Sequence, residues 1–116
     1  MKMALVVALV SDDKTTEVID AARAGGATGD TIISGVRGEG LRPEKTFLGL
    51  DLTARREMVL FLVAEGRARD ILERIAAAGG MDQEHGDGVA FQITIEDAVG
   101  LSTQLPRLME ELEEAQ

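Results

Sequence analysis

Residues 3–10 read Met3-Ala4-Leu5-Val6-Val7-Ala8-Leu9-Val10. This run has no polar side chain, and such a continuous apolar segment predicts a strand that is buried on both faces. A second run of the same character, Glu57 to Ala64, contains Met-Val-Leu-Phe-Leu-Val. A stretch with helical periodicity follows each run, so the chain predicts two successive strand–helix units.

Apolar residues recur at three- and four-residue spacing after both strands. The two stripes are Thr15, Val18, Ile19 and Ala22, and Ala68, Ile71, Leu72 and Ile75. Gly25-Gly26 and Gly79-Gly80 follow the stripes and predict the helix ends. Ser11 is predicted to cap the first helix, with Asp12 and Asp13 in its first turn, where acidic side chains are favourable.

Two further strands complete the pattern, at Asp30 to Val36 and at Val89 to Ile95. The order βαββαβ predicts an α+β, ferredoxin-like fold, in which an antiparallel sheet carries two helices on one face. Apolar side chains on both faces of the strands leave the second face without a cover. We therefore expect a homo-oligomer whose sheets pack around a symmetry axis.

Composition excludes several classes of function. The 116-residue chain is expected to form one core domain, and its net charge of −9 and its lack of Tyr and Trp disfavour nucleic-acid binding. Without cysteine there is no disulfide, thiol nucleophile or cysteine metal site. The first apolar run is too short to span a membrane and lacks a small-residue cleavage site, so we expect a cytoplasmic protein without membrane insertion.

Two glycine-rich segments lie at the ends of strands and predict ligand-binding turns. They read Gly35-Val36-Arg37-Gly38-Glu39-Gly40 and His85-Gly86-Asp87-Gly88. Glycine lets backbone N–H groups approach a ligand closely, and arginine adds charge-assisted donors for phosphate or carboxylate. Taken singly, each segment also fits an ordinary turn, and the first is no dinucleotide fingerprint because no helix follows it.

The connection between the two halves concentrates positive charge. Residues 37–56 hold five basic and three acidic side chains, a net charge of +2 in a chain of −9. A positive loop beside glycine N–H groups is typical of an anion site, and a solvated loop with scattered charges is the alternative.

His85 is the only histidine of the chain. The acidic residues near it, Asp82, Glu84 and Asp87, match no zinc or EF-hand spacing, so no metal site is predicted. His85 is expected to be a loop residue without a catalytic role. The chain is therefore not expected to be an enzyme, and a nucleotide hydrolase that uses Glu39, Asp87 or His85 is the least favoured class.

The order of these motifs resembles the PII signal-transduction superfamily. The resemblance rests on Gly26-Ala27-Thr28-Gly29-Asp30-Thr31, Val36-Arg37-Gly38-Glu39-Gly40, Gly86-Asp87-Gly88 and Ile95-Glu96-Asp97-Ala98-Val99. It implies a PII-like domain at 1–101, with a T-loop at 41–55 and a B-loop at 81–88. Residues 102–116 would form an amphipathic tail, which packs on its own trimer or binds a partner.

PII proteins are homotrimers that bind adenine nucleotides in the clefts between subunits and signal through the T-loop. The resemblance therefore implies a set of nucleotide-binding residues in this chain. They are Thr31 at the adenine, Arg37, Gly38, Glu39 and Gly40 at the T-loop base, Gly86, Asp87 and Gly88 around the phosphates, and Arg56 in place of a phosphate-binding lysine.

The chain departs from the family pattern in three ways. Val89 stands where the family has a lysine after the B-loop, which favours ADP or AMP over tightly bound ATP. The absence of tyrosine excludes uridylylation of the T-loop, and that loop is shorter than usual.

These departures are similar to those of divergent PII-like proteins that attend transporters or bicarbonate metabolism. The resemblance thus implies a transporter or metabolic enzyme as the partner, and bicarbonate as a further candidate ligand. The alternative is a CutA-like structural or metal-tolerance trimer that binds no nucleotide.

Overall fold

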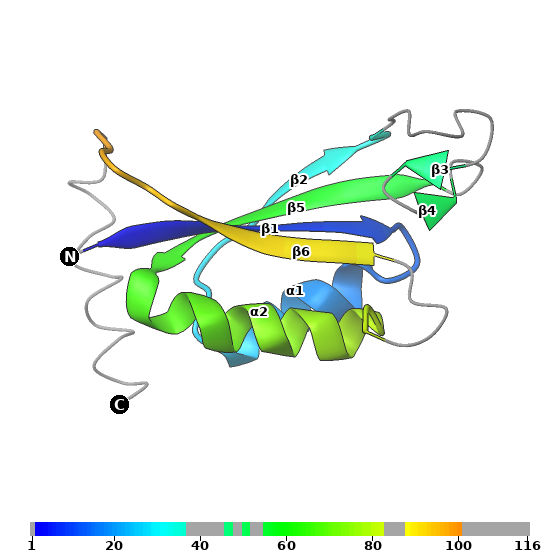
Figure 1. The fold of residues 1–116 in the computed structure, drawn as a ribbon, viewed down its shortest axis with the longest axis horizontal. Coiled ribbons are helices and arrows are strands. Elements are labelled where there is room, and N and C mark those ends of the chain that lie inside the picture. The colour runs from blue at the N-terminus through cyan, green and yellow to red at the C-terminus, as the bar shows by residue number, and fades with distance from the viewer. Residues whose placement is uncertain (1, 37–45, 48–49, 52–54, 83–87, 101–116) are drawn as a thin grey trace.

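The predicted strand at residues 3–10 lies in the middle of the sheet (Figure 1). The structure, a computed structural model, describes residues 2–36, 46–47, 50–51, 55–82 and 88–100. Strand β1, Met3–Ser11, pairs antiparallel with β5, Arg56–Ala64, and with β6, Gly88–Thr94. The short strand β2, Thr31–Ser34, pairs with β5, so the order is β2-β5-β1-β6.

Both helices lie on the same side of this sheet (Figure 1). Helix α1 is Thr15–Ala24 and helix α2 is Glu65–Gly79, each following its strand as predicted. Their apolar stripes pack against the sheet in one core, whose largest fully buried side chains include Phe61, Ile71 and Ile75. The ferredoxin-like fold predicted from the order of elements is confirmed.

Strand register sorts the sheet residues onto two faces. Val6 opposes Phe61, and both belong to the core under the helices, whereas the next pair, Val7 and Leu60, belongs to the other side. We call that other side the open face. Its apolar residues, placed by the same alternation, are Met3, Leu5, Val7, Leu9, Ile33, Met58, Leu60, Leu62, Ala64, Val89, Phe91 and Ile93.

The predicted cap of the first helix is wrong. Ser11 is the last residue of β1, and its carbonyl accepts a hydrogen bond from the Lys14 N–H (2.9 Å), which closes a turn over residues 12–14. Helix α1 starts only at Thr15, and Lys14 at its N-cap makes no side-chain cap hydrogen bond. The Ser11 hydroxyl instead donates to the Asp13 carboxylate. Asp12 and Asp13, which were predicted in the first turn of the helix, therefore lie in the turn between β1 and α1.

Strand β2 is shorter than the predicted segment from Asp30 to Val36. Gly35 follows its last residue with φ of +70°, a left-handed conformation that ends an extended strand. Within the predicted T-loop the structure describes a small antiparallel pair that the sequence did not predict. It consists of β3, Thr46–Phe47, and β4, Leu50–Asp51. The predicted tail at 102–116 lies outside the described residues.

Candidate functional site

Three of the predicted nucleotide-binding residues are described: Thr31, Arg56 and Gly88. The other six, Arg37, Gly38, Glu39, Gly40, Gly86 and Asp87, lie outside the described residues. The geometry of the site is therefore built from the strand ends that lead into these segments.

Arg56 and Gly88 lie at the same end of the sheet. Arg56 begins β5 opposite Ser11, and Gly88 begins β6 opposite Val10, so only the end of β1 separates them. Adjacent strands are about 4.8 Å apart, which puts the two backbones roughly 10 Å apart. The sheet thus brings one predicted phosphate-binding residue from each half of the chain to the same end of the strands.

The Arg56 side chain is held inside the protomer. Its residue is 4% exposed, whereas its neighbour Arg55 is exposed. A buried guanidinium keeps its charge and needs polar partners. The register also places Arg56 on the open face, in the same row as Met58 and Leu60.

Gly88 is required by packing in the protomer. A Cβ atom at this position would lie 3.1 Å from the Leu9 carbonyl oxygen and 3.2 Å from Cε of Met81. Both contacts are closer than most Cβ contacts in proteins, so the Leu9 backbone and the Met81 side chain would have to shift by a few tenths of an ångström. The close approach that the sequence predicted for a ligand is therefore made, at Gly88, to the chain itself.

Thr31 lies apart from these two residues. Its Cα partner is Leu60, four positions along β5 from Arg56. At about 3.3 Å per residue, Thr31 is roughly 13 Å further along the sheet. It shares the open face with Met58 and Leu60, so apolar side chains lie between its hydroxyl and the position of Arg56. The structure does not bring Thr31 together with Arg56 and Gly88 within one protomer.

A cluster of hydrogen bonds that the sequence did not predict joins the elements at this end. The Thr15 hydroxyl donates to Oε1 of Glu57 (2.5 Å), and the Ser34 hydroxyl donates to Oε2 (2.7 Å). These two bonds lower the pKa of Glu57, the bond from Thr15 more strongly. The Ser11 hydroxyl likewise lowers the pKa of Asp13.

No sequence pattern marked this cluster, because its members are 42 and 23 residues apart. The one signal was Glu57 itself. It is an acidic residue at the position two before Val59, in the alternating row that continues with Phe61 and Val63 on the face under the helices. A charged group in that row requires partners, and only the fold shows which ones.

The family comparison now decides the affiliation. The family model of nitrogen regulatory protein P-II matches residues 3–105. The chain belongs to the PII family. The match spans both strand–helix units and both glycine-rich segments, so the resemblance that these motifs suggested is confirmed.

Solved structures of PII-like proteins share the fold of this chain. A PII-like signalling protein from Thermus thermophilus is 22% identical with a TM-score of 0.59, over 82% of this chain and 88% of that one. The CPII protein from Thiomonas intermedia, solved with ADP, AMP and acetate, is 18% identical with a TM-score of 0.60, over 83% and 90%. The curated proteins contain no match to this chain.

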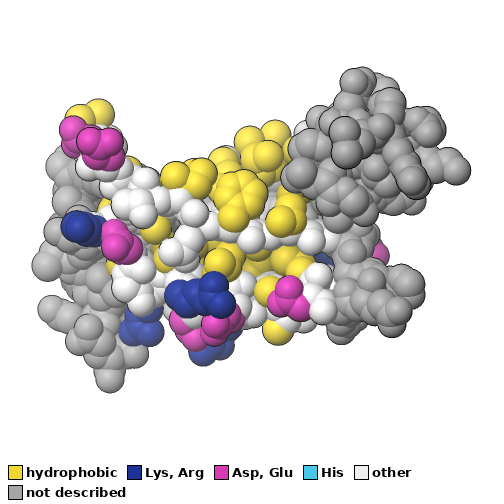
Figure 2. Space-filling view, in the orientation of Figure 1, with side chains coloured by type: hydrophobic (Ala, Val, Ile, Leu, Met, Phe, Trp, Pro, Cys, Tyr) yellow, Lys and Arg dark blue, Asp and Glu magenta, His cyan; other side chains and the backbone are white. Residues whose placement is uncertain are grey.

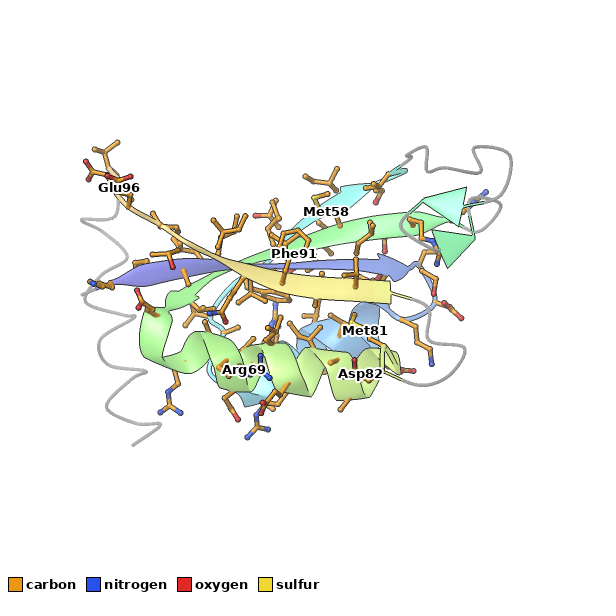
Figure 3. The ribbon with its side chains drawn as sticks, viewed as in Figure 1. Met58, Arg69, Met81, Asp82, Phe91 and Glu96 are labelled. Carbon is orange, nitrogen blue, oxygen red and sulfur yellow. The ribbon has the colours of Figure 1, made fainter. Side chains whose placement is uncertain are left out.

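The described residues of this PII protein also form a hollow away from the strand ends. It has a volume of about 450 Å³ and lies along α2, with Arg69 and Asp82 on the helix side and Ala90 on β6 (Figure 3). Thr31, Arg56 and Gly88 do not line it.

Two further classes of feature are absent from the described part of this PII protein. Its acidic residues form no group of three or more that could hold a metal ion. Within the same residues, no helix is long and apolar enough to cross a membrane.

Proposed function

We propose that this protein is a PII-like signal-transduction regulator. It binds an adenine nucleotide, ADP or AMP in preference to ATP, in the clefts between the subunits of a homotrimer. It controls a transporter or a metabolic enzyme through the T-loop at residues 41–55. Membership of the PII family supports this class of function, because family members are regulators rather than enzymes.

Chain connectivity at the end of the sheet carries the proposal. The Val36 N–H donates to the Arg56 carbonyl (3.2 Å), so the exit from β2 lies directly beside the start of β5. Arg37 follows Val36 directly in the chain. Asp87 likewise precedes Gly88, the first residue of β6, and only β1 lies between β5 and β6. Both glycine-rich segments are therefore anchored at one edge, as a shared phosphate site requires.

The trimer is supported by the open face. Ile33, Phe91 and Ile93 lie there with 45%, 43% and 49% of their surface exposed. Figure 2 shows apolar side chains gathered along the side of the molecule that lies away from the helices, where Figure 3 places Met58 and Phe91. An exposed apolar patch on a sheet is characteristic of a protein–protein interface.

Two observations support an adenine nucleotide as the ligand: a bound nucleotide in a similar structure, and the distance between the predicted contact residues. The CPII structure holds ADP and AMP. A nucleotide carries its base and its phosphates at opposite ends, so a hydroxyl at Thr31 and phosphate contacts at Arg37 and Gly88 can belong to one ligand. Bicarbonate is a further candidate ligand, bound by the positive segment around Arg37 to Arg56.

Calorimetry tests this proposal. Titration of the wild-type protein with ADP, AMP and ATP is expected to show binding below millimolar concentration, with ATP the weakest. Arg37→Ala is expected to weaken ADP binding by about tenfold, the loss of one charge-assisted contact. Arg69→Ala removes the same charge from exposed α2, in an ion pair with Glu73, and serves as the matched control.

Two results would contradict the proposal. If no adenine nucleotide binds at millimolar concentration while the protein is trimeric by light scattering, the CutA-like alternative holds. If the protein is monomeric at every concentration, the intersubunit site itself is wrong. Product analysis after prolonged incubation with ATP separates binding from hydrolysis.

A further inference from the structure

Glu57 connects three elements with one carboxylate. It lies near the start of β5, Ser34 ends β2, and Thr15 begins α1. One carboxylate oxygen accepts the Thr15 hydroxyl and the other accepts the Ser34 hydroxyl. Hydrogen bonds to an ionised acceptor are shorter and about twice as strong as those between neutral groups. Glu57 therefore links the sheet end to the first helix more strongly than an apolar side chain would.

The same place anchors both ends of the segment that contains the T-loop. Val36, where the chain leaves β2, donates its N–H to the Arg56 carbonyl (3.2 Å). Asp12, in the turn before α1, donates its N–H to the Arg55 carbonyl (3.0 Å). The exit and the return of residues 37–54 are thus tied to each other and to the start of α1, and Glu57 is next to Arg56 in sequence.

The position of Glu57 is otherwise one for an apolar residue. It occupies the first place of the row that continues with Val59, Phe61 and Val63, all buried under the helices. Glu57 itself is only half-buried, and its bond with Ser34 is exposed, so the two hydroxyls stabilise a carboxylate that also reaches solvent. Thr15, one of its two donors, is itself 6% exposed. The pair of hydroxyls thus explains the carboxylate, and the carboxylate fixes both hydroxyls.

We propose that Glu57 is a positioning residue for the nucleotide site. Its carboxylate clamps Thr15 and Ser34, holds the end of β2 and the start of β5 against the start of α1, and so sets the place of Arg56 and of Gly35. The positioning role rests on the proposed nucleotide binding. The clamp, meaning the two hydrogen bonds from Thr15 and Ser34 to Glu57, is a property of the protomer alone.

Amide hydrogen exchange tests the clamp without any ligand. The variants Thr15→Val and Ser34→Ala each remove one hydroxyl donor. We expect the N–H groups of Asp12 and Val36 to exchange about tenfold faster in either variant. Each variant loses one hydrogen bond to the Glu57 carboxylate, and the carbonyls that accept these two N–H groups belong to the residues directly before Glu57 in the chain. The internal controls are the Glu65 N–H, bonded to Lys2, and the Ile95 N–H, bonded to Met3, at the opposite end of the sheet. Their exchange is expected to stay unchanged.

Two outcomes of the exchange experiment would overturn the clamp. Equal acceleration at all four amides would show a general loss of stability instead of a local release. No acceleration at Asp12 and Val36 would show that the hydroxyl bonds do not hold the base of the segment.

ADP titration tests the positioning role. Ser34→Ala is expected to weaken ADP binding about fivefold, because the base of the site is less ordered before the ligand binds. Glu57→Gln is expected to retain binding, since an amide can accept from one hydroxyl and donate to the other. Glu57→Asp is one methylene shorter, cannot reach both hydroxyls, and is expected to weaken binding as Ser34→Ala does. Glu73→Ala, on exposed α2, is the matched control.

The two experiments fail independently. If wild type binds no adenine nucleotide, the proposed function is wrong, and the exchange rates still decide whether the clamp exists. If wild type binds ADP and both Ser34→Ala and Glu57→Asp bind it equally well, the positioning role is wrong.

Discussion

The two faces of the sheet carry similar apolar side chains but bury them to different degrees. Under the helices, Val6, Val59 and Phe61 have no exposed surface. On the open face, Phe91 and Ile93, both on β6, leave 43% and 49% of their surface exposed. Two helices bury the central strands on one side, although Ile32 on β2 stays 44% exposed there. On the other side Val7 and Leu9 of the central strand β1 are buried, but no described element covers the outer strands.

The two faces therefore contribute to different equilibria. Phe61 stabilises the folded protomer, because its burial is complete within one chain. Phe91 is expected to gain a comparable burial in the proposed homotrimer. A sheet that is apolar on both faces thus divides its hydrophobic free energy between folding and association, and substitution of the two phenylalanines measures this division.

The largest expected effect is that of Phe61→Ala. Removal of a fully buried phenylalanine costs about 3–5 kcal/mol of the free energy of unfolding, which is a large part of the stability of a small domain. Urea unfolding followed by circular dichroism measures the loss. A loss below about 1 kcal/mol would show that this face is not the main core.

The matched substitution on the open face, Phe91→Ala, is expected to act on association. We expect it to weaken the proposed homotrimer by about 2 kcal/mol per subunit interface, since buried aromatic residues dominate such interfaces. Light scattering over a range of concentrations measures the change. If Phe91→Ala leaves assembly unchanged and destabilises each protomer instead, the division between the two faces is wrong.

A smaller effect is expected at the end of the helix that covers the core. Gly80 caps α2 with φ of +64° and ψ of +29°, in the left-handed region. Gly80→Ala is expected to cost about 1 kcal/mol, because a Cβ is unfavourable there. Gly66→Ala, within α2 where a Cβ meets no atom within 4 Å, is the control and is expected to stabilise by up to about 1 kcal/mol. Thermal unfolding of both variants measures the contrast, and equal effects would contradict it.

The smallest effect concerns pH at the polar end of the covered face. Hydrogen bonds from Thr15 and Ser34 lower the pKa of Glu57 below its ordinary value of 4.5. The ionised carboxylate therefore stabilises the fold above that ordinary value, and this contribution is lost as the pH falls through the lowered pKa of the folded state.

Comparison with the double variant Thr15→Val/Ser34→Ala isolates this contribution. Urea unfolding is measured for both proteins at about pH 6 and about pH 3. The double variant is expected to be less stable at the higher pH, and the gap is expected to narrow at the lower one. A gap that is the same at both pH values would show that the charge on Glu57 contributes nothing.

Most of the fold was predictable from local patterns. The continuous apolar runs placed β1 and β5, and the stripe that contains Val18 placed α1. Local patterns failed where a neighbouring element decided the outcome. Ser11 suits a helix cap by residue type, but its position at the end of β1 gives its hydroxyl to Asp13 instead. Strand β2 ends at Ser34 because Gly35 turns the chain.

The candidate site was less predictable than the fold. Sequence motifs selected Arg56 and Gly88, and the register placed both at one end of the sheet. The motifs did not show that Arg56 is buried, or that a Cβ at Gly88 would crowd the Leu9 carbonyl oxygen. They also missed Glu57, because a hydrogen-bonded cluster of residues far apart in the chain has no signature along it.

The order of apolar runs and glycines alone determined the class of fold, since alternation and helical periodicity are local properties of a chain. The glycine-rich motifs carried the resemblance to the family, which the family model confirmed. The tertiary structure decided which face of the sheet the helices cover, which predicted contacts meet, and which polar groups satisfy one another. Those outcomes depend on register between strands and on burial, and neither exists until residues distant in sequence lie side by side.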